Sequence, residues 1–379
     1  MRILHVVTLL SPDAAYGGPV RVAVNQSGAL RDRGHEVVLA AAARGYERMP
    51  SSVDDVPVRA FRARTALPGI GFAGIRGAGM TRWVSNHLSE FDVVHVHLAR
   101  DFVTLPAARA CIKRRIPVVV QTHGMIDASS RLLAKPLDLF WTRPVLRAAS
   151  TVFYLTAREA CDLREVAGDL VNTHELHNGV PPGVPPDSST APARSEVLFL
   201  ARLHPRKRPG MFVEMARRLV QEGSSADFAL VGPDEGTKQE VDALVANYGL
   251  QSRVRYEGPL APEQTADRMR RASIYVLPAI DEPYPMSVLE AMSVGLPVVV
   301  TDTCGLAPLI EETHSGIVVG PDLDSLTDAV RRVLNAPGLL QTMGENARRT
   351  VLERLGMASV GEILERTYQR AVQCATEKG

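Results

Sequence analysis

The stretch DEPYPMSVLEAMSVGLPVVV, residues 281–300, decides the fold. Val298 to Val300 have the apolar, β-branched character of a buried parallel strand, and Gly295 and Pro297 end the apolar run that precedes them. That run, MSVLEAM, predicts a short helix after a proline-rich turn. Similar strand and helix patterns alternate along the whole chain, which predicts an α/β protein with doubly wound parallel sheets.

Two carboxylates, Glu282 and Glu290, lie in this stretch with seven residues between them. Glu282 comes just before the predicted helix, and Glu290 lies about one turn into it. The first backbone N–H groups of the helix, at Met286, Ser287 and Val288, have no partner inside the helix and favour an anion. A phosphate with hydroxyl groups on both sides, as in a nucleotide-sugar, suits this layout. The alternative is a pair of solvated surface glutamates.

A second charged pair follows the strand-like run EVLFL at residues 196–200. Arg202 stands at the end of this run, and Lys207 follows it with four residues between them. Two fixed cations at the end of a strand can stabilise the negative charge of a leaving diphosphate. The alternative is a solvated basic turn, which is the role we expect for Arg206 and Arg208.

In the first half of the chain, buried strands are predicted at residues 3–8, 36–41, 92–97, 117–122 and 151–155. Ligands of doubly wound sheets bind beyond the carboxyl ends of the strands. His97, His123 and Gly124 are therefore expected near a site. A histidine at a strand end can equally be a hydrogen-bonded structural residue. Gly17 and Gly18 precede a helix predicted at about 19–33, where they can approach a phosphate or simply form a turn.

No metal ion is expected. His95 and His97 point the same way on one strand, but no third ligand is evident, so packing and polar lining are preferred. Asp322-Leu323-Asp324 has the form D-x-D, yet it precedes a predicted helix, and Asp324 is interpreted as its N-cap. The glycine turn is not G-x-G-x-x-G, so a nicotinamide cofactor is not supported, and no other cofactor is expected.

Composition limits the class of protein. A chain of 379 residues is long enough for two domains, and its net charge of +1 gives no general attraction to nucleic acid. Four cysteines without C-x-x-C spacing suggest reduced thiols. The polar residues from Ser11 onward argue against a signal peptide, and no apolar run approaches the ~20 residues of a membrane span. A cytoplasmic protein is expected, with the Pro-, Gly- and Ser-rich segment after Val180 as the linker between its domains.

An R-x4-K pair followed by an E-x7-E pair, on these elements, resembles the GT4 family of retaining glycosyltransferases with the GT-B fold. The resemblance covers nearly the whole chain and implies two Rossmann-like domains that close over a cleft. Residues 1–180 would bind the acceptor, with a last helix at 358–379 packing back on them. Residues 181–357 would bind the nucleotide-sugar.

The resemblance also implies a role for each residue. Glu282 and His123 would contact the donor sugar, and Glu290 the ribose. Arg202 and Lys207 would bind the phosphates, assisted by backbone groups at Gly17, Gly18, Met286, Ser287 and Val288. The turn Gly258-Pro259-Leu260 would offer backbone groups to the base, so UDP and GDP are not distinguished. Pro283-Tyr284 replaces the frequent Gly-Phe of the family, which leaves the donor sugar open.

The expected reaction is metal-independent transfer of a hexose from a UDP- or GDP-sugar, with retention, to a lipid-linked or oligosaccharide acceptor in bacterial cell-surface glycan synthesis. Basic and apolar residues mix in segments 59–82 and 131–147, which suits peripheral contact with the inner, anionic face of a membrane. A solvated basic face is the alternative. Two other functions remain open: a nucleotide-sugar epimerase of GT-B architecture, and a non-catalytic nucleotide-sugar-binding protein.

Overall fold

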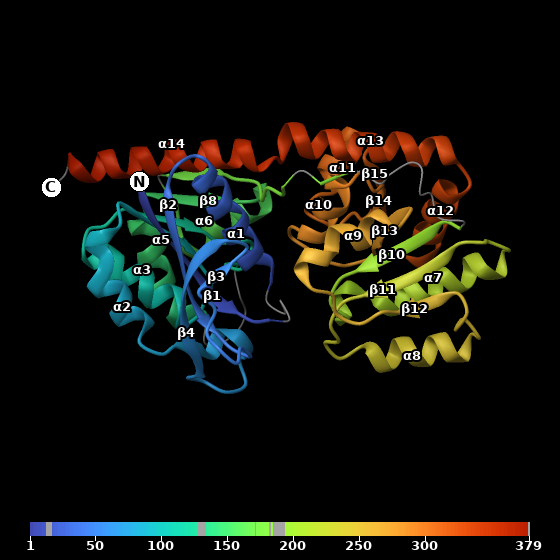
Figure 1. The fold of residues 1–379 in the computed structure, drawn as a ribbon, viewed down its shortest axis with the longest axis horizontal. Coiled ribbons are helices and arrows are strands. Elements are labelled where there is room, and N and C mark those ends of the chain that lie inside the picture. Colours follow the sequence, from blue (N-terminus) through green and yellow to red (C-terminus); the bar gives the residue numbers. More distant parts are fainter. Residues whose placement is uncertain (13–16, 128–133, 171, 182, 185–193, 378–379) are drawn as a thin grey trace. The chain divides into compact units, whose positions relative to one another are not determined.

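The computed structural model describes residues 1–12, 17–127, 134–170, 172–181, 183–184 and 194–377. The chain forms two compact units. Unit 1 comprises Met1–Gly179 and Met357–Gly379, and unit 2 comprises Val180–Gly356. Each unit contains a sheet of mainly parallel strands with helices on its faces (Figure 1). The predicted α/β class with two Rossmann-like domains is confirmed.

The sheet of unit 1 has the strand order β3-β4-β2-β1-β6-β7-β8-β9, with β5 beside β4. All of its pairings are parallel except those that β4 makes with β3 and β5. The strands are β1 (Arg2–Leu10), β2 (Glu36–Ala43), β3 (Ser52–Val53), β4 (Val56–Thr65), β5 (Ile75–Gly77), β6 (Val93–His97), β7 (Val118–Gln121), β8 (Thr151–Tyr154) and β9 (Thr173–Glu175).

Helices cover both faces of this sheet. They are α1 (Gly17–Asp32), α2 (Met80–His87), α3 (Thr104–Lys113), α4 (Ala134–Leu137), α5 (Arg143–Ala148), α6 (Ala157–Ala167) and the last helix of the chain, α14 (Met357–Thr376), with a π-helical turn at Asp138–Thr142. One core joins the sheet to α2, α3, α5 and α6. On the opposite face, Leu364 and Tyr368 of α14 are fully buried against β1, β6 and β7. Segments at the two ends of the sequence therefore share one core.

The sheet of unit 2 is parallel and has the order β12-β11-β10-β13-β14-β15. Its strands are β10 (Glu196–Leu200), β11 (Asp227–Val231), β12 (Val254–Tyr256), β13 (Ile274–Leu277), β14 (Val298–Thr301) and β15 (Gly316–Val319). The order reverses between β10 and β13, which makes the carboxyl ends of these two strands the topological switch point where ligands of such sheets bind.

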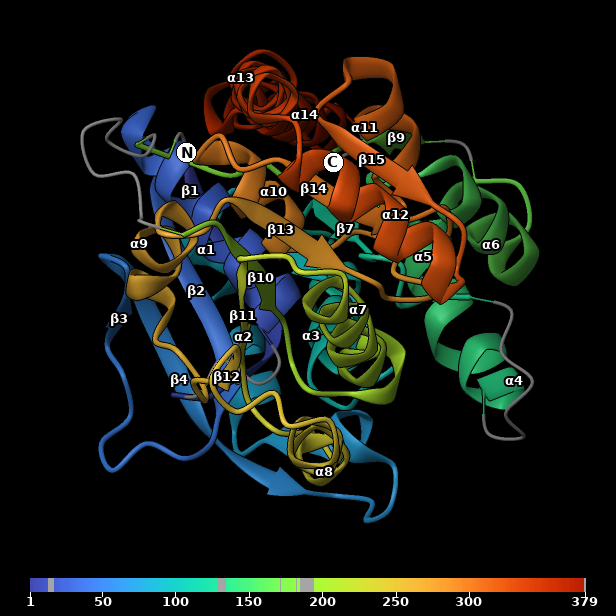
Figure 2. The same ribbon diagram turned by 90° about the vertical axis from the view of Figure 1, so that its right-hand side faces the viewer.

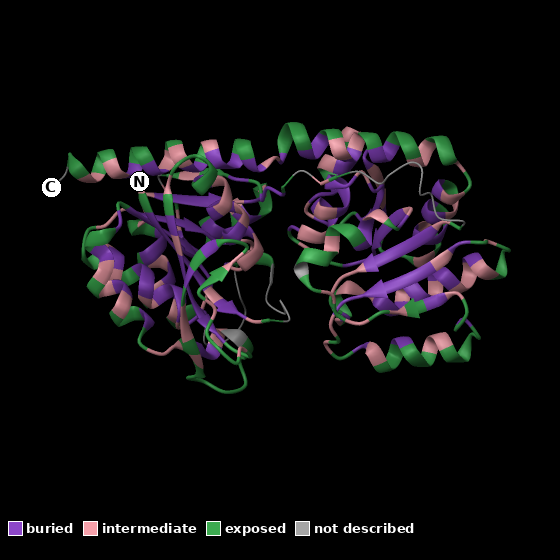
Figure 3. Ribbon diagram, viewed as in Figure 1, coloured by how far each residue is buried: buried purple, intermediate pink, exposed green. Residues whose placement is uncertain are grey.

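The helices of unit 2 also lie on both faces of its sheet, as Figure 2 shows. They are α7 (Pro209–Gln221), α8 (Lys238–Asn247), α9 (Thr265–Arg270), α10 (Met286–Ser293), α11 (Ala307–Thr313), α12 (Leu323–Leu334) and α13 (Pro337–Arg354). Helices α7 and α12 pack together, and α10 and α11 pack against α13. Figure 3 shows the central strands of this sheet, β10, β11, β13 and β14, mostly buried and the helices exposed on their outer faces. None of the helices among the described residues has both the length and the apolar character to cross a membrane.

Two local expectations need correction. Helix α1 begins at Gly17, so the two glycines are its first residues rather than a turn before it. The N-cap of α12 is Asp322, whose side chain accepts from Ser325 N at 2.8 Å, whereas Asp324 lies inside the helix. Segment 59–82 contains the end of β4, all of β5 and the start of α2. Residues 185–193 of the linker and 131–133 of the basic segment lie outside the described residues.

Candidate active site

Lys207 and Glu282 meet beside the switch point of unit 2. Lys207 lies in the turn between β10 and α7, and its Nζ donates to Glu282 Oε2 at 2.5 Å. The two side chains are only 12% and 14% exposed. Burial lowers the pKa of Lys207, and the attraction of Glu282 acts in the opposite direction. The structure thus brings together one member of each charged pair.

The loop that carries Glu282 is held by close backbone contacts. The Glu282 carbonyl accepts from Gly305 N at 2.9 Å, and Asp281 N donates to Thr303 Oγ1 at 3.2 Å. A Cβ atom at Gly305 would lie 1.7 Å from the carbonyl oxygen of Pro283. Asp281 adopts a φ of 49°, in the left-handed region that non-glycine residues rarely occupy. The segment after β14 therefore fixes the position of the Glu282 loop.

Arg202 follows β10 and is paired with an acid from the next βα loop. Its NH1 donates to both carboxylate oxygens of Glu235, at 2.8 and 2.9 Å. Arg202 is close enough to Lys207 for its charge to contribute to the lowered pKa of that lysine, together with Arg206. Arg206 also approaches Glu282 at 3.5 Å, so it is not merely the solvated residue that we expected. Three cations thus surround this part of unit 2.

Helix α10 places Ser287 and Glu290 next to this cluster. Ser287 Oγ accepts from the hydroxyl of Tyr275, a fully buried residue of β13, at 2.7 Å. The negative charges of Glu290 and Glu282 both contribute to raising the pKa of Tyr275, after the larger effect of burial. The expectation of a free N–H at Val288 is not met, because this group donates to the Pro285 carbonyl at 3.1 Å, a contact that closes the first turn of the helix.

Two other regions predicted to contact the donor lie at the ends of elements: the turn at Gly258 and Leu260 in unit 2, and the start of α1 in unit 1. Gly258 follows β12 with a φ of 80°, and its carbonyl already accepts from Gly232 N at 2.9 Å. Leu260 is half-buried in the same turn. In unit 1, a Cβ atom at Gly18 would meet no other described residue within 4 Å.

His123 occupies a strained turn at the carboxyl end of β7 in unit 1. Its φ is 52° and that of Gly124 is 70°. A buried carboxylate holds the turn: Glu159 accepts from Gly124 N and Thr122 Oγ1, both at 2.5 Å, and from Leu155 N at 2.6 Å. Such backbone strain is characteristic of functional sites.

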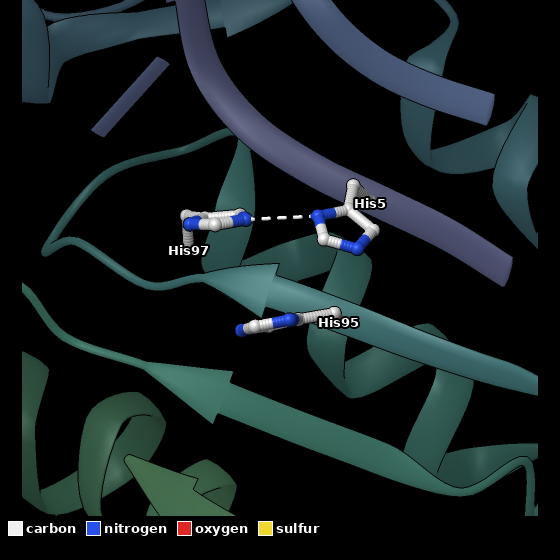
Figure 4. Close-up of side chains that lie close together, drawn as sticks. All are labelled: His5, His95 and His97. Atoms are coloured by element: carbon white, nitrogen blue, oxygen red, sulfur yellow. Dashed lines mark hydrogen bonds between the residues drawn. The ribbon is translucent and has the colours of Figure 1, made fainter. Parts of the chain in front are cut away.

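His95 and His97 are joined by a third histidine that the sequence analysis missed. His5 on β1 is the register partner of His95 on β6, and the three rings lie together in the core (Figure 4). One nitrogen from each ring lies within 4.8 Å of the others, a separation that could suit a metal ion. The rings of His95 and His97, however, are stacked, with centroids 4.6 Å apart and an angle of 12° between planes. Nearly parallel stacked rings cannot both direct in-plane lone pairs at one ion about 2.1 Å from each nitrogen.

Comparison with known proteins identifies both halves of the chain. The family described as Glycosyl transferases group 1 matches residues 186–350, and the Glycosyl transferase 4-like domain matches residues 17–179. Among curated relatives, an α-D-kanosaminyltransferase of Streptomyces kanamyceticus is 28% identical over 67% of this chain and 70% of its own length. A D-inositol 3-phosphate glycosyltransferase 2 of Catenulispora acidiphila is 26% identical over 98% of this chain and 94% of its own.

Solved structures share the fold at lower identity. Sucrose-phosphate synthase of Thermosynechococcus elongatus has a TM-score of 0.78 and 19% identity, covering 98% of this chain and 99% of its own. Anabaena HepE in complex with UDP and glucose has a TM-score of 0.77 and 18% identity, covering 97% and 99%.

Proposed function

Because this chain belongs to the GT4-type glycosyltransferases with the GT-B fold, we propose that it transfers a hexose from a UDP- or GDP-sugar with retention of anomeric configuration. The observation that carries the proposal is the contact between Lys207 and Glu282 beside Arg202, at the switch point of unit 2. A cation for phosphate and an acid for sugar hydroxyls thus stand side by side. The UDP bound to the structurally similar HepE supports a nucleotide-sugar donor.

Each proposed role follows from the chemistry of the side chain. Arg202 and Lys207 stabilise the charge that develops on the leaving diphosphate, and the first N–H groups of α10, at Met286 and Ser287, add backbone donors. Glu282 and His123 orient the sugar, and Glu290 accepts from the ribose hydroxyls. Gly17, Gly18 and the turn at Gly258 contribute backbone contacts to the phosphates and the base. No carboxylate acts as a covalent nucleophile in this proposal.

A thermal-shift screen tests the donor. Free donor in excess over its Kd raises the melting temperature of a protein that binds it only when folded. We expect UDP- or GDP-sugars to raise the Tm, and ADP- and dTDP-sugars to raise it less. Lys207→Ala should abolish the shift with the same ligand. Equal shifts in wild type and Lys207→Ala would contradict the proposed phosphate site.

For the acceptor, we propose a lipid-linked or oligosaccharide substrate of cell-surface glycan synthesis, reached from an anionic membrane surface. The support is a pair of exposed apolar residues beside an arginine in unit 1. Leu139 and Phe140 are 51% and 63% exposed. Beside them, the Arg109 guanidinium stacks on Trp141 at 4.3 Å and donates to the Phe140 carbonyl. Apolar side chains next to cations suit a membrane interface.

Sedimentation with anionic liposomes at low salt tests this surface. The double variant Leu139→Ser, Phe140→Ser should lose binding that the wild type shows. Leu352→Ser is the matched control, because Leu352 is similarly exposed, at 49%, but lies in unit 2. The membrane proposal fails if the wild type stays in the supernatant, or if both variants bind equally.

A further inference from the structure

A continuous line of hydrogen bonds crosses the face of the unit 1 sheet that α14 covers. We call it the histidine chain, and its members in order are His123, His97, His5, Tyr368 and His95. Nε2 of His123 lies 2.8 Å from Nδ1 of His97, and Nε2 of His97 lies 3.1 Å from Nδ1 of His5. The Tyr368 hydroxyl lies 3.4 Å from Nε2 of His5 and 2.6 Å from Nδ1 of His95. Every link therefore joins one ring nitrogen to the opposite ring nitrogen of the next histidine, directly or through the hydroxyl.

All four imidazoles are neutral at pH 7. Burial lowers the pKa of His5 and of His123 to about 3, and holds the pKa of His95 and of His97 well below the ordinary value. A neutral imidazole carries one N–H donor and one bare acceptor nitrogen. Each histidine of the chain can therefore donate at one link and accept at the other.

Only two arrangements of protons satisfy every link and also give the Tyr368 hydroxyl hydrogen an acceptor within the chain. In the first, all four histidines carry the proton on Nε2, and Tyr368 donates to His95. In the second, all four carry it on Nδ1, and Tyr368 donates to His5. A mixture of the two would place two N–H groups or two lone pairs face to face, or would make Tyr368 accept from both His5 and His95 and leave its own hydrogen without an acceptor.

The two ends of the chain decide between these arrangements. Nε2 of His95 and Nδ1 of His123 are buried and have no partner among the described residues. The first arrangement leaves an N–H group unpaired at His95, in the interior of the core. The second leaves a bare nitrogen there and places the unpaired N–H on His123, at the carboxyl end of β7. Each arrangement therefore leaves one N–H group unpaired. His95 is fully buried whereas His123 is partly exposed, so water or a ligand can pair with the N–H group only at His123, which favours the second arrangement.

We propose that His97, His5 and Tyr368 are positioning residues that hold His123 as an Nδ1–H donor toward an oxygen atom of the bound nucleotide-sugar. The contact with the nucleotide-sugar rests on the proposed function, whereas the common tautomer of the histidine chain does not. An unpaired buried donor is unfavourable, and an incoming oxygen acceptor offsets part of that cost. The strained turn at His123 and Gly124, held by Glu159, keeps the donor in place.

Long-range ¹H–¹⁵N spectra of ¹⁵N-histidine-labelled wild type at pH 7, without ligand, test the arrangement directly. We expect four neutral imidazoles, all with the proton on Nδ1. A charged imidazole, an Nε2–H tautomer or mixed tautomers among the four would overturn the proposal. Addition of zinc sulfate should leave the four signals unchanged, and their common displacement would indicate a metal site instead.

Two matched variants separate positioning from packing. His95 and His97 lie on the same strand and are 0% and 1% exposed, but only His97 lies between Tyr368 and His123. In His97→Phe, His123 should become a mixture of tautomers, and the KM for UDP-glucose should rise about threefold to tenfold, the scale of one lost hydrogen bond. In His95→Phe, His123 should keep its Nδ1–H, because Tyr368 can still donate to His5. Equal effects of the two variants on His123 would mean that the histidine chain only packs the core and does not position His123.

The contact with the nucleotide-sugar has its own readout. Saturation with UDP-glucose, with binding verified by thermal shift, should displace the Nδ1–H signal of His123. Binding without displacement would overturn this contact and leave the common tautomer standing. If UDP-glucose does not bind, the same test is made with GDP-mannose, and absence of binding by both would count against the proposed function rather than the histidine chain. The wild-type spectrum decides the tautomer even if His97→Phe fails to fold.

Discussion

At the scale of single residues, the cations proposed to bind the diphosphate are already paired with carboxylates. Lys207 is paired with Glu282 and Arg202 with Glu235. A diphosphate must compete with these carboxylates, or bind beside them with the pairs intact. The first pair is buried and the second is partly exposed, so the two pairs should respond differently to substitution.

Lys207→Ala and Glu282→Ala should each reduce turnover by at least ~100-fold, the scale for losing one group that stabilises the transition state. Steady-state kinetics with the donor found by thermal shift measure this loss. Arg331→Ala is the control, since it removes an exposed ion pair with Glu222 elsewhere in unit 2. Near wild-type rates in either folded variant would remove that residue from the site.

Glu235→Gln should tighten donor binding by up to about fivefold, because an exposed ion pair contributes at most about 1 kcal/mol. The amide keeps the shape of Glu235 but no longer competes with phosphate for Arg202. Isothermal titration with the nucleoside diphosphate measures the change in Kd. Weaker binding would instead mean that Glu235 is needed to orient Arg202.

At the scale of elements, the site depends on how one loop supports another. Gly305 follows β14 and touches the loop that carries Glu282, although the two residues are on opposite sides of α10 and β14 in the sequence. The E-x7-E spacing identifies the acids, but it contains no sign of this contact. Gly305 is a residue that the sequence analysis did not single out.

Gly305→Ala should weaken donor turnover by about 10- to 100-fold, because displacement of a positioning loop by about 1 Å has that effect. The new methyl group would lie 1.7 Å from the Pro283 carbonyl oxygen, so the loop has to move. Gly338→Ala is the matched control, since no described residue lies within 4 Å of a Cβ atom there. Equal kcat/KM in the two variants would show that the loop tolerates the shift.

Elements whose signals are local were predictable from the sequence. The strands β1, β2, β6, β7, β8, β10 and β14, the helix of the 281–300 stretch and the two charged pairs all follow from patterns within one βα unit. The strands β3, β4, β5 and β9 were not predicted. His5 was missed because it meets His95 only through the pairing of β1 with β6, across 90 residues of sequence. The N-cap of α12 was misplaced by two residues, because Asp322 and Asp324 are chemically equivalent candidates.

At the scale of the whole molecule, the buried histidines make unit 1 sensitive to acid. Their pKa values are lower in the folded protein than the 6.5 of an unfolded chain, and are about 3 for His5 and His123. The unfolded state therefore binds more protons between about pH 6.5 and 3, and the free energy of unfolding falls as the pH falls through this range. Each such histidine contributes up to about 1.4 kcal/mol per pH unit.

Urea denaturation at pH 7.5, 6.0 and 5.0 measures this loss. The two tryptophans of the chain, Trp83 and Trp141, both lie in unit 1, so intrinsic fluorescence reports on that unit. The midpoint should fall steadily over this range. Asp101 and Glu159, whose pKa values are raised mainly by burial, oppose part of the loss. A midpoint that stays constant between pH 7.5 and 5.0 would contradict neutral buried histidines.

Unit 2 is inserted between two parts of unit 1, and this order has a consequence for biosynthesis. A ribosome completes every residue of unit 2 before it makes α14, which carries the hydroxyl that binds His5 and His95. Until then, the face of β1, β6 and β7 that receives Leu364 and Tyr368 remains uncovered. The first unit to be started is thus the last to be finished, and during synthesis its open apolar face is a natural target for chaperones.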